Sequence, residues 1–161
     1  MQNSFKSLSL TYRKASVAIR GLLSLNETTC KLLLEQIKEF TSIEEAIVIS
    51  TCNRTELYYS SEEDQSEVLM KLIGTVKGVS KITEYSNHFN IINNHDEAVN
   101  HLFEVSMGLD AQVIGDIQIS NQIKNAYQWA ADTQMAGPFL HRIMHTIFFT
   151  NKRVVQETAF R

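Results

Sequence analysis

The sequence predicts an α+β fold, in which a small sheet with packed helices is followed by a helical part. Three observations lead to this prediction. The short apolar runs typical of strands are confined to residues 1–93, whereas apolar residues recur at helical spacing throughout residues 94–161. The chain has 161 residues, of which 43% are hydrophobic and 20% are charged, and this length and composition are those of one globular domain.

The sheet part begins with a strand over residues 5–10, in which Leu8 and Leu10 share one face. A helix is expected over residues 26–40, because Asn26 is a suitable N-cap and apolar residues recur behind it at helical spacing. The strand and the helix are the first two elements of the sheet part.

Two more strands are expected at residues 45–50 and 55–60, separated by a short polar turn. An apolar stripe then predicts a helix over residues 66–78, and residues 88–93 are the last strand candidate. The resulting order, βαββαβ, is that of a ferredoxin-like domain with a small mixed or antiparallel sheet.

Three helices are expected in residues 94–161. Asn94 is a suitable cap for the first of them, and Gly108 is a suitable stop. The second covers residues 118–133, and the third is long and starts at Pro138, a residue suited to the first helical position. The third helix meets no stop signal before the chain ends, so we expect the sequence to be part of a longer polypeptide.

Composition excludes several classes of protein. With 15 basic and 18 acidic side chains, the net charge of −3 excludes a generally basic nucleic-acid coat. No apolar run reaches the ~18–20 residues of a membrane helix, and the first residues lack the pattern of a secretory signal. We therefore expect a cytoplasmic protein with no membrane partner, whose two cysteines are free thiols. No glycine-rich nucleotide-binding fingerprint is present.

The turn Ser-Thr-Cys-Asn-Arg-Thr-Glu over residues 50–56 is the sharpest candidate for chemistry. Arg54 stands two residues after Cys52 and could favour its thiolate, while neighbouring amides could stabilise an oxyanion. The residues leave two interpretations of Cys52 open, a nucleophile and a small buried filler, and free cysteines are often buried. Cys30, inside an amphipathic helix, is interpreted as a filler.

Histidines offer a partner for such a thiol. His101 flanks the apolar stripe of its helix and could serve as a base or acid, or simply as a histidine at the edge of the core. His141 and His145 are four residues apart, as metal ligands on one helix face are. A lone pair at this spacing is a weak signal, so we predict no metal site.

The glycine-punctuated segment from Gly108 to Gln118 permits close approach to a ligand. Gln118 and Gln122 are four residues apart and could point the same way from the next helix. An ordinary connection between helices, capped by Asp116, explains the same residues equally well.

Three stretches, over residues 48–58, 96–127 and 151–158, resemble the N-terminal catalytic part of the glutamyl-tRNA reductase family. They have the order and spacing found in that family, and the resemblance runs from about residue 8 to the end of the chain. The most specific signature is Ser-Thr-Cys-Asn-Arg-Thr-Glu, followed by the segment from Gly-Leu-Asp to Gln-Ile. The family reduces the glutamyl ester of charged tRNA to glutamate-1-semialdehyde for tetrapyrrole and haem biosynthesis.

The resemblance implies roles for residues of the first stretch. Cys52 falls on the nucleophile, which forms a thioester while tRNA leaves. Thr51, Asn53 and Arg54 fall on the substrate-binding turn, where Arg54 suits the free carboxylate of the glutamyl group. His101 falls on a histidine important for activity, as a proton shuttle or an orienting group.

The same resemblance places Asp116, Gln118 and Gln122 at further substrate-pocket positions. Two departures from the family pattern are Met107 and Ala111, which stand where the family has serines. Asp116 itself stands where the family has a glutamate, and residues 12–16 depart from the family's early motif.

The resemblance also implies what the chain works with. The substrate is glutamyl-tRNA(Glu), and the cofactor is NADPH, bound by a domain that these 161 residues do not include. We expect residues 1–93 to form the α/β part of the catalytic domain and residues 94–161 its helical part, leading into the connecting helix. The full-length protein is expected to be a homodimer, and glutamate-1-semialdehyde aminomutase is a possible partner.

Two other functions stay open at this point. One is a non-catalytic module of the same fold that binds tRNA or a partner protein, an alternative motivated by Met107 and Ala111. The other is a hydrolase with a cysteine and a histidine that acts on a different ester or amide.

Overall fold

The computed structural model describes residues 4–11, 13–51, 53–108 and 118–159. The strands are β1 (Phe5–Thr11), β2 (Ala46–Ser50), β3 (Arg54–Ser60) and β4 (Asn90–Ile92). The helices are α1 (Val17–Leu23), α2 (Glu27–Phe40), α3 (Ser66–Lys77), the 3₁₀ helix η1 (Ile82–His88), α4 (His95–Ser106), α5 (Gln118–Asp132) and α6 (Pro138–Ala159). Within the described part of the chain, no helix has both the length and the apolar character that crossing a bilayer requires.

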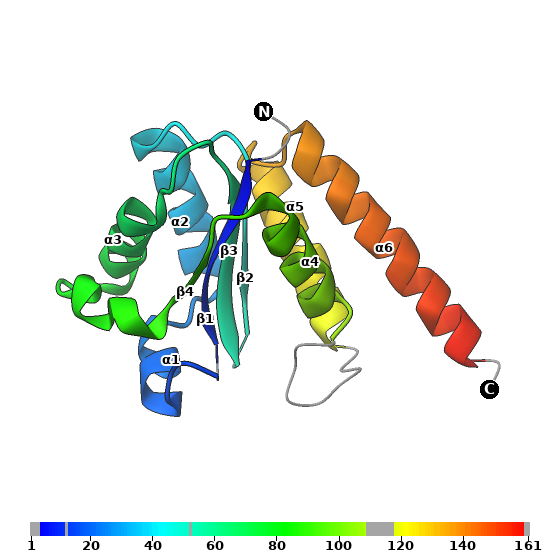
Figure 1. The fold of residues 1–161 in the computed structure, drawn as a ribbon, viewed down its shortest axis with the longest axis horizontal. Coiled ribbons are helices and arrows are strands. Elements are labelled where there is room, and N and C mark those ends of the chain that lie inside the picture. The colour runs from blue at the N-terminus through cyan, green and yellow to red at the C-terminus, as the bar shows by residue number, and fades with distance from the viewer. Residues whose placement is uncertain (1–3, 12, 52, 109–117, 160–161) are drawn as a thin grey trace.

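The four strands form one antiparallel sheet in the order β2-β3-β1-β4. Helices α1, α2 and α3 cover one face of this sheet, and α4 and α5 cover the other, with α6 alongside them (Figure 1). The observed architecture is thus α+β, as the sequence predicts, and every pair of neighbouring strands is antiparallel.

Two hydrophobic clusters lie on the two faces of the sheet. The strand residues in the cluster under α1, α2 and α3 are Leu8, Leu10, Ala46, Val48, Leu57 and Tyr59. The strand residues in the cluster under α4, α5 and α6 are Phe5, Ile47, Ile49 and Tyr58. Successive strand side chains point to opposite faces, so β1, β2 and β3 each contribute to both clusters.

The predicted helix boundaries are confirmed where a cap defines them. Asn26 accepts a hydrogen bond from the Thr29 amide at 2.9 Å, and the Thr29 hydroxyl accepts one from the Asn26 amide at 2.8 Å. Asn94 caps α4, Gly108 follows the end of α4 with a φ of 74°, and α6 begins at Pro138. These signals are local, which is why the sequence alone predicts them.

Two parts of the sheet region differ from the prediction. Helix α1 was not expected, because only one of its residues, Leu23, is buried and seven residues leave almost no periodic stripe to detect. The last strand was expected from His88, but the Phe89 amide bonds the Ser86 carbonyl at 3.2 Å and closes a 3₁₀ turn there. Consequently β4 starts only at Asn90.

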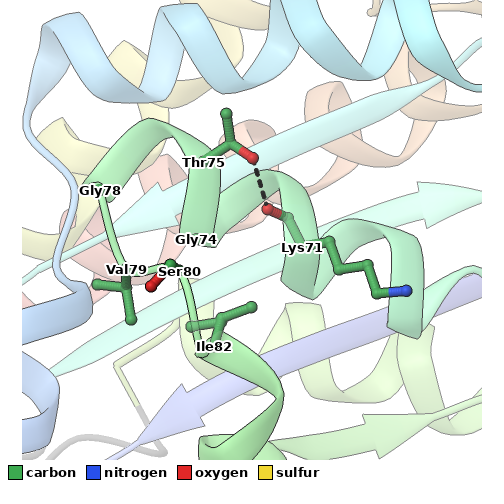
Figure 2. Close-up of a pocket in the computed structure, with 7 residues that line it drawn as sticks. All are labelled: Lys71, Gly74, Thr75, Gly78, Val79, Ser80 and Ile82. Atoms are coloured by element: carbon green, nitrogen blue, oxygen red, sulfur yellow. Dashed lines mark hydrogen bonds between the residues drawn. The ribbon is translucent and has the colours of Figure 1, made fainter.

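A close contact joins α3 to η1 at Gly74. A Cβ at this position would lie 2.7 Å from the Val79 carbonyl oxygen and 2.8 Å from the Ile82 Cβ, so only glycine fits. The hollow beside this contact has a volume of about 410 Å³ (Figure 2). It has a single ionisable side chain, that of Lys71, and lies on α3, across the sheet from α4.

Candidate active site

The predicted nucleophile turn joins β2 to β3. Its two flanks are held by hydrogen bonds: the Thr51 amide donates to the Arg54 carbonyl at 2.7 Å, and the Asn53 amide donates to the Thr51 hydroxyl at 3.1 Å. The Ser50 hydroxyl accepts the Leu25 amide at 2.9 Å, which ties the segment between α1 and α2 to the end of β2. The positions on either side of residue 52 are therefore firmly placed.

Two of the predicted site residues, Cys52 and Asp116, lie outside the described residues. Gln118 is the first residue of α5, and Gln122 lies one turn later with an exposed side chain. Their predicted roles therefore stay predictions.

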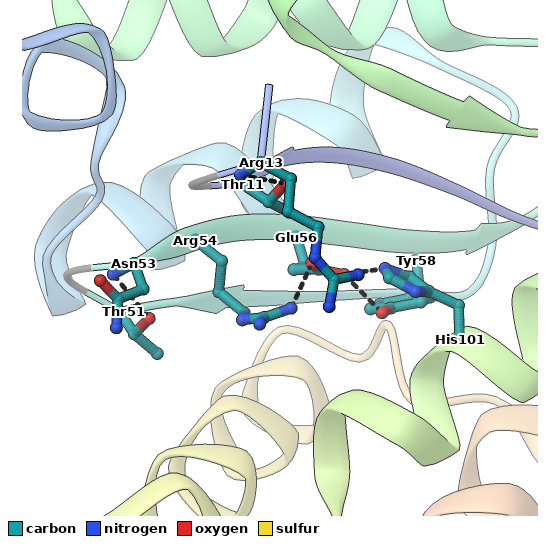
Figure 3. A network of polar contacts seen from close by, with 8 residues as sticks. All are labelled: Thr11, Arg13, Thr51, Asn53, Arg54, Glu56, Tyr58 and His101. Carbon is teal, nitrogen blue, oxygen red and sulfur yellow. Dashed lines mark hydrogen bonds and ion pairs between the residues drawn. The ribbon is translucent and has the colours of Figure 1, made fainter. Parts of the chain in front are cut away.

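A fully buried carboxylate, Glu56, is the centre of a polar network on the face of the sheet under α4 (Figure 3). Arg54 donates from Nη1 to Glu56 Oε2 at 3.0 Å, and the Tyr58 hydroxyl donates to Glu56 Oε1 at 2.5 Å. His101 Nε2 lies 2.9 Å from the same Oε1. One carboxylate thus brings together the predicted arginine and the predicted histidine.

Position and register explain why these groups meet. Arg54, Glu56 and Tyr58 alternate along β3, so their side chains share one face. His101 comes from α4, which packs on that face over β1. Figure 3 also shows the Arg13 side chain extending from the turn after β1 toward this network.

Burial makes the network energetically demanding. Arg54 is 3% exposed and Glu56 is 0% exposed, and a buried ion pair of this kind is tolerated only when hydrogen bonds satisfy both charges. The additional Tyr58 and His101 contacts satisfy the carboxylate further. Because burying charged groups is costly, this cluster is a candidate functional site.

His101 lies at the edge of the core. Its side chain is 14% exposed, and its Nε2 is 2.9 Å from the Glu56 carboxylate, which orients the ring. Its role as a base or acid stays a prediction.

Sequence reasoning missed Glu56 and Tyr58 as site residues. The available signal was the alternation of Arg54, Glu56 and Tyr58 within one expected strand, which places a carboxylate between an arginine and a phenol on a single face. Nothing in the sequence shows that this face is buried under His101.

Cys30 is confirmed as a structural residue. It is 1% exposed, and burial raises the pKa of its thiol to about 12. A thiol with so high a pKa is scarcely ionised at neutral pH, so Cys30 is a poor nucleophile.

In the described ranges, no group of three or more His, Cys, Asp or Glu side chains is arranged to hold a metal ion.

Comparison with known proteins identifies the family. The model of the family described as "Glutamyl-tRNAGlu reductase, N-terminal domain" matches residues 8–158. A glutamyl-tRNA reductase of Cytophaga hutchinsonii is 58% identical over 161 residues, covering 100% of this chain and 38% of the relative. A glutamyl-tRNA reductase of Rubrobacter xylanophilus is 35% identical over 151 residues, covering 93% of this chain and 35% of the relative.

The fold has a counterpart among solved structures. The glutamyl-tRNA reductase of Methanopyrus kandleri superimposes with a TM-score of 0.77 at 24% sequence identity, covering 98% of this chain and 35% of that protein. The chain thus spans well under half the length of the relatives that it matches. From the family match and the sequence identities, we conclude that these 161 residues belong to the glutamyl-tRNA reductase family and correspond to its N-terminal domain.

Proposed function

We propose that the chain is the part of a glutamyl-tRNA reductase that accepts the glutamyl group from glutamyl-tRNA(Glu) on Cys52. In the full-length protein the thioester is then reduced to glutamate-1-semialdehyde for tetrapyrrole biosynthesis. The named relatives and the matched family support this proposal. The observation that carries it is the buried Glu56, which holds Arg54 and His101 together at β3, the strand that begins two residues after Cys52 in the sequence.

The acyl transfer follows from ordinary thiol chemistry. The Cys52 thiolate attacks the ester carbonyl, and the bond to the 3′-terminal ribose oxygen of tRNA breaks as the thioester forms. His101, oriented by Glu56, supplies the proton that the leaving ribose oxygen takes up.

Recognition of the glutamyl side chain is assigned to Arg54. Its Nη1 contact with Glu56 fixes the guanidinium plane. A planar guanidinium binds a carboxylate through two parallel hydrogen bonds. Asp116, Gln118 and Gln122 are proposed as further pocket residues.

The reduction step needs a hydride donor, which we propose to be NADPH bound by a domain outside these 161 residues. No residue of this chain is assigned to that cofactor, because the chain has no glycine-rich dinucleotide fingerprint. NADPH supplies a hydride when bound, and the departing thiolate of Cys52 is regenerated as the aldehyde forms.

The remaining proposals concern organisation. We propose residues 1–93 as a ferredoxin-like α/β part, supported by the sheet order β2-β3-β1-β4, and residues 94–161 as the helical part that ends in the connecting helix. We also propose that the full-length protein is a cytoplasmic homodimer and that glutamate-1-semialdehyde aminomutase is its partner.

Labelling with glutamyl-tRNA tests the acyl transfer directly. Incubation with [¹⁴C]glutamyl-tRNA should leave acid-stable label on the chain, and hydroxylamine should release it, because a thioester is cleaved by this nucleophile. Cys52→Ala should carry no label. Cys30→Ala is the matched control, since it removes the only other cysteine and should be labelled normally.

Other outcomes separate the alternatives. Label that persists in Cys52→Ala contradicts the proposed nucleophile. An unlabelled wild-type chain that still binds tRNA, with a Cys52 that does not react with iodoacetamide, indicates the non-catalytic module. Equal labelling by other aminoacyl-tRNAs indicates a general hydrolase or acyltransferase without a glutamyl pocket.

A further inference from the structure

Two exposed histidines and a tyrosine form a compact group on α5 and α6, away from the Glu56 network. His141 and His145 lie one turn apart on α6, and their ring centroids are 4.2 Å apart. Tyr127 of α5 has its hydroxyl 2.8 Å from His141 Nδ1, and its ring packs edge-on against His145 at 5.8 Å. The proposed acyl transfer does not use this group.

We propose that His141 and His145 form a two-nitrogen site for a divalent transition metal. Histidines four residues apart on a helix face the same way, which allows both imidazoles to bind one ion. The 4.2 Å separation of the ring centroids shows that the two side chains already lie together, so little side-chain ordering is needed on binding.

The Tyr127 hydroxyl determines which ring nitrogen of His141 can bind a metal ion. Because the Tyr127 hydroxyl occupies Nδ1 of His141, Nε2 is the nitrogen of that ring left for a metal. A hydrogen bond to the second nitrogen is the usual way in which proteins orient a metal-binding histidine. Tyr127 therefore acts as a positioning residue for the site.

The donor set determines the class of ion. Imidazole nitrogens favour Cu²⁺, Ni²⁺ and Zn²⁺ over Mg²⁺ and Ca²⁺, which require oxygen ligands. The nearest cation in sequence, Arg142, lines the apolar groove with Phe103 and Phe139. It thus faces α4, on a different side of α6, and does not oppose a metal at the imidazoles.

The two histidines alone do not complete the coordination sphere of a metal ion. No third His, Cys, Asp or Glu ligand joins the pair among the described residues, so water completes the coordination sphere. We therefore expect one exchangeable ion per chain, with affinity in the order Cu²⁺ above Ni²⁺ and Zn²⁺.

Calorimetric titration with Ni²⁺ tests the proposal, using chain without a histidine tag and in a Cys52→Ala background that removes a competing thiol. The starting protein should bind one Ni²⁺. His141→Ala and His145→Ala should each weaken binding by at least tenfold, and Tyr127→Phe should weaken it by about tenfold, as loss of an orienting hydrogen bond does. His88→Ala removes another histidine, which is half-buried, and should bind Ni²⁺ like the starting protein.

A second measurement counts the nitrogen donors. The electron paramagnetic resonance spectrum of the Cu²⁺ form should show hyperfine coupling to two imidazole nitrogens, falling to one in either histidine variant. Equal Ni²⁺ affinity in the starting protein and the His141→Ala/His145→Ala double variant overturns the proposal, as does binding that depends on His88. Unchanged affinity in Tyr127→Phe overturns the role of the phenol. All variants alter exposed or half-buried groups, and circular dichroism checks that each one folds.

Discussion

The two faces of the sheet carry different kinds of buried residue. The face under α1, α2 and α3 is packed with aliphatic side chains, and its buried lysine, Lys6, is at one end with its Nζ 2.6 Å from the Ser61 carbonyl. The face under α4 and α5 contains the buried Arg54 and Glu56, besides Ser7 and Ser9, whose hydroxyls have no hydrogen-bond partner among the described residues. One face is therefore mainly aliphatic, and the other holds a buried polar network.

The contrast is already present within single strands. In β1, Leu8 belongs to the aliphatic cluster, while its neighbour Ser9 pairs in register with Glu56. In β3, Leu57 and Tyr58 contribute to opposite clusters. Buried polar groups cost free energy unless they are paired, so a protein keeps them where they serve another purpose. The stability of the aliphatic face offsets this cost.

The largest effect on stability is expected on the aliphatic face. Leu33 of α2 is 0% exposed, and Leu33→Ala should lower the free energy of unfolding by about 3 kcal/mol because it leaves a cavity. Urea denaturation measures this loss, while the folded variant should still be labelled by glutamyl-tRNA at the wild-type rate. Slower labelling of the folded variant would show that the two faces are not functionally separate.

The next effect concerns the centre of the polar face. Glu56→Gln keeps the shape of the side chain but removes the charge that pairs with Arg54 and orients His101, so we expect about 2 kcal/mol of destabilisation. Acylation of Cys52 should slow by roughly a hundredfold, the lower end of the contribution of general acid–base catalysis. Single-turnover labelling measures the rate. An unchanged rate in folded Glu56→Gln would mean that Glu56 has only a structural role.

A smaller effect is expected from the phenol of the same network. Tyr58→Phe removes a single hydroxyl that donates to Glu56, which should cost about 1–2 kcal/mol in urea denaturation. Arg54 and His101 keep their contacts with the carboxylate, so labelling should slow by less than in Glu56→Gln. If Tyr58→Phe slows labelling as much as Glu56→Gln does, the phenol takes part in the chemistry itself.

The last effect is absent at neutral pH, appears only at high pH and belongs to the aliphatic face. Burial raises the pKa of Cys30 from 9.0 to about 12. The stability that this shift contributes is fully present below the pKa of the unfolded thiol and is lost as pH rises toward the folded value. Unfolding free energies measured between pH 8 and pH 11 should therefore decline, and the decline should be shallower in Cys30→Ala. Parallel curves for the two proteins would contradict this assignment.

Local signals explain which parts of the fold were predictable. Asn26, Asn94, Gly108 and Pro138 act on the few residues beside them, and each lies where the sequence predicts a helix boundary. Helix α1 was missed because its burial depends on packing against α3 and β3, which its own seven residues do not reveal.

The candidate site was predictable only in part. The Cys-Asn-Arg turn and His101 stand out in the sequence, whereas Glu56 does not. The role of Glu56 depends on contacts with residues at very different distances along the chain. Arg54 is two residues away, but His101 lies 45 positions further on and reaches Glu56 only through the packing of α4 on the sheet.

The sequence by itself determined the α+β class, the capped helix ends, the structural role of Cys30 and the resemblance that led to the family. Tertiary structure alone decided that a buried carboxylate joins Arg54 to His101 and that Tyr127 meets the two histidines of α6. The physical reason is the distance along the chain over which each kind of interaction acts. Caps and periodicity depend on neighbours within a turn of helix or a pair of strand residues, whereas these groupings arise only when separate elements pack and exclude water between them.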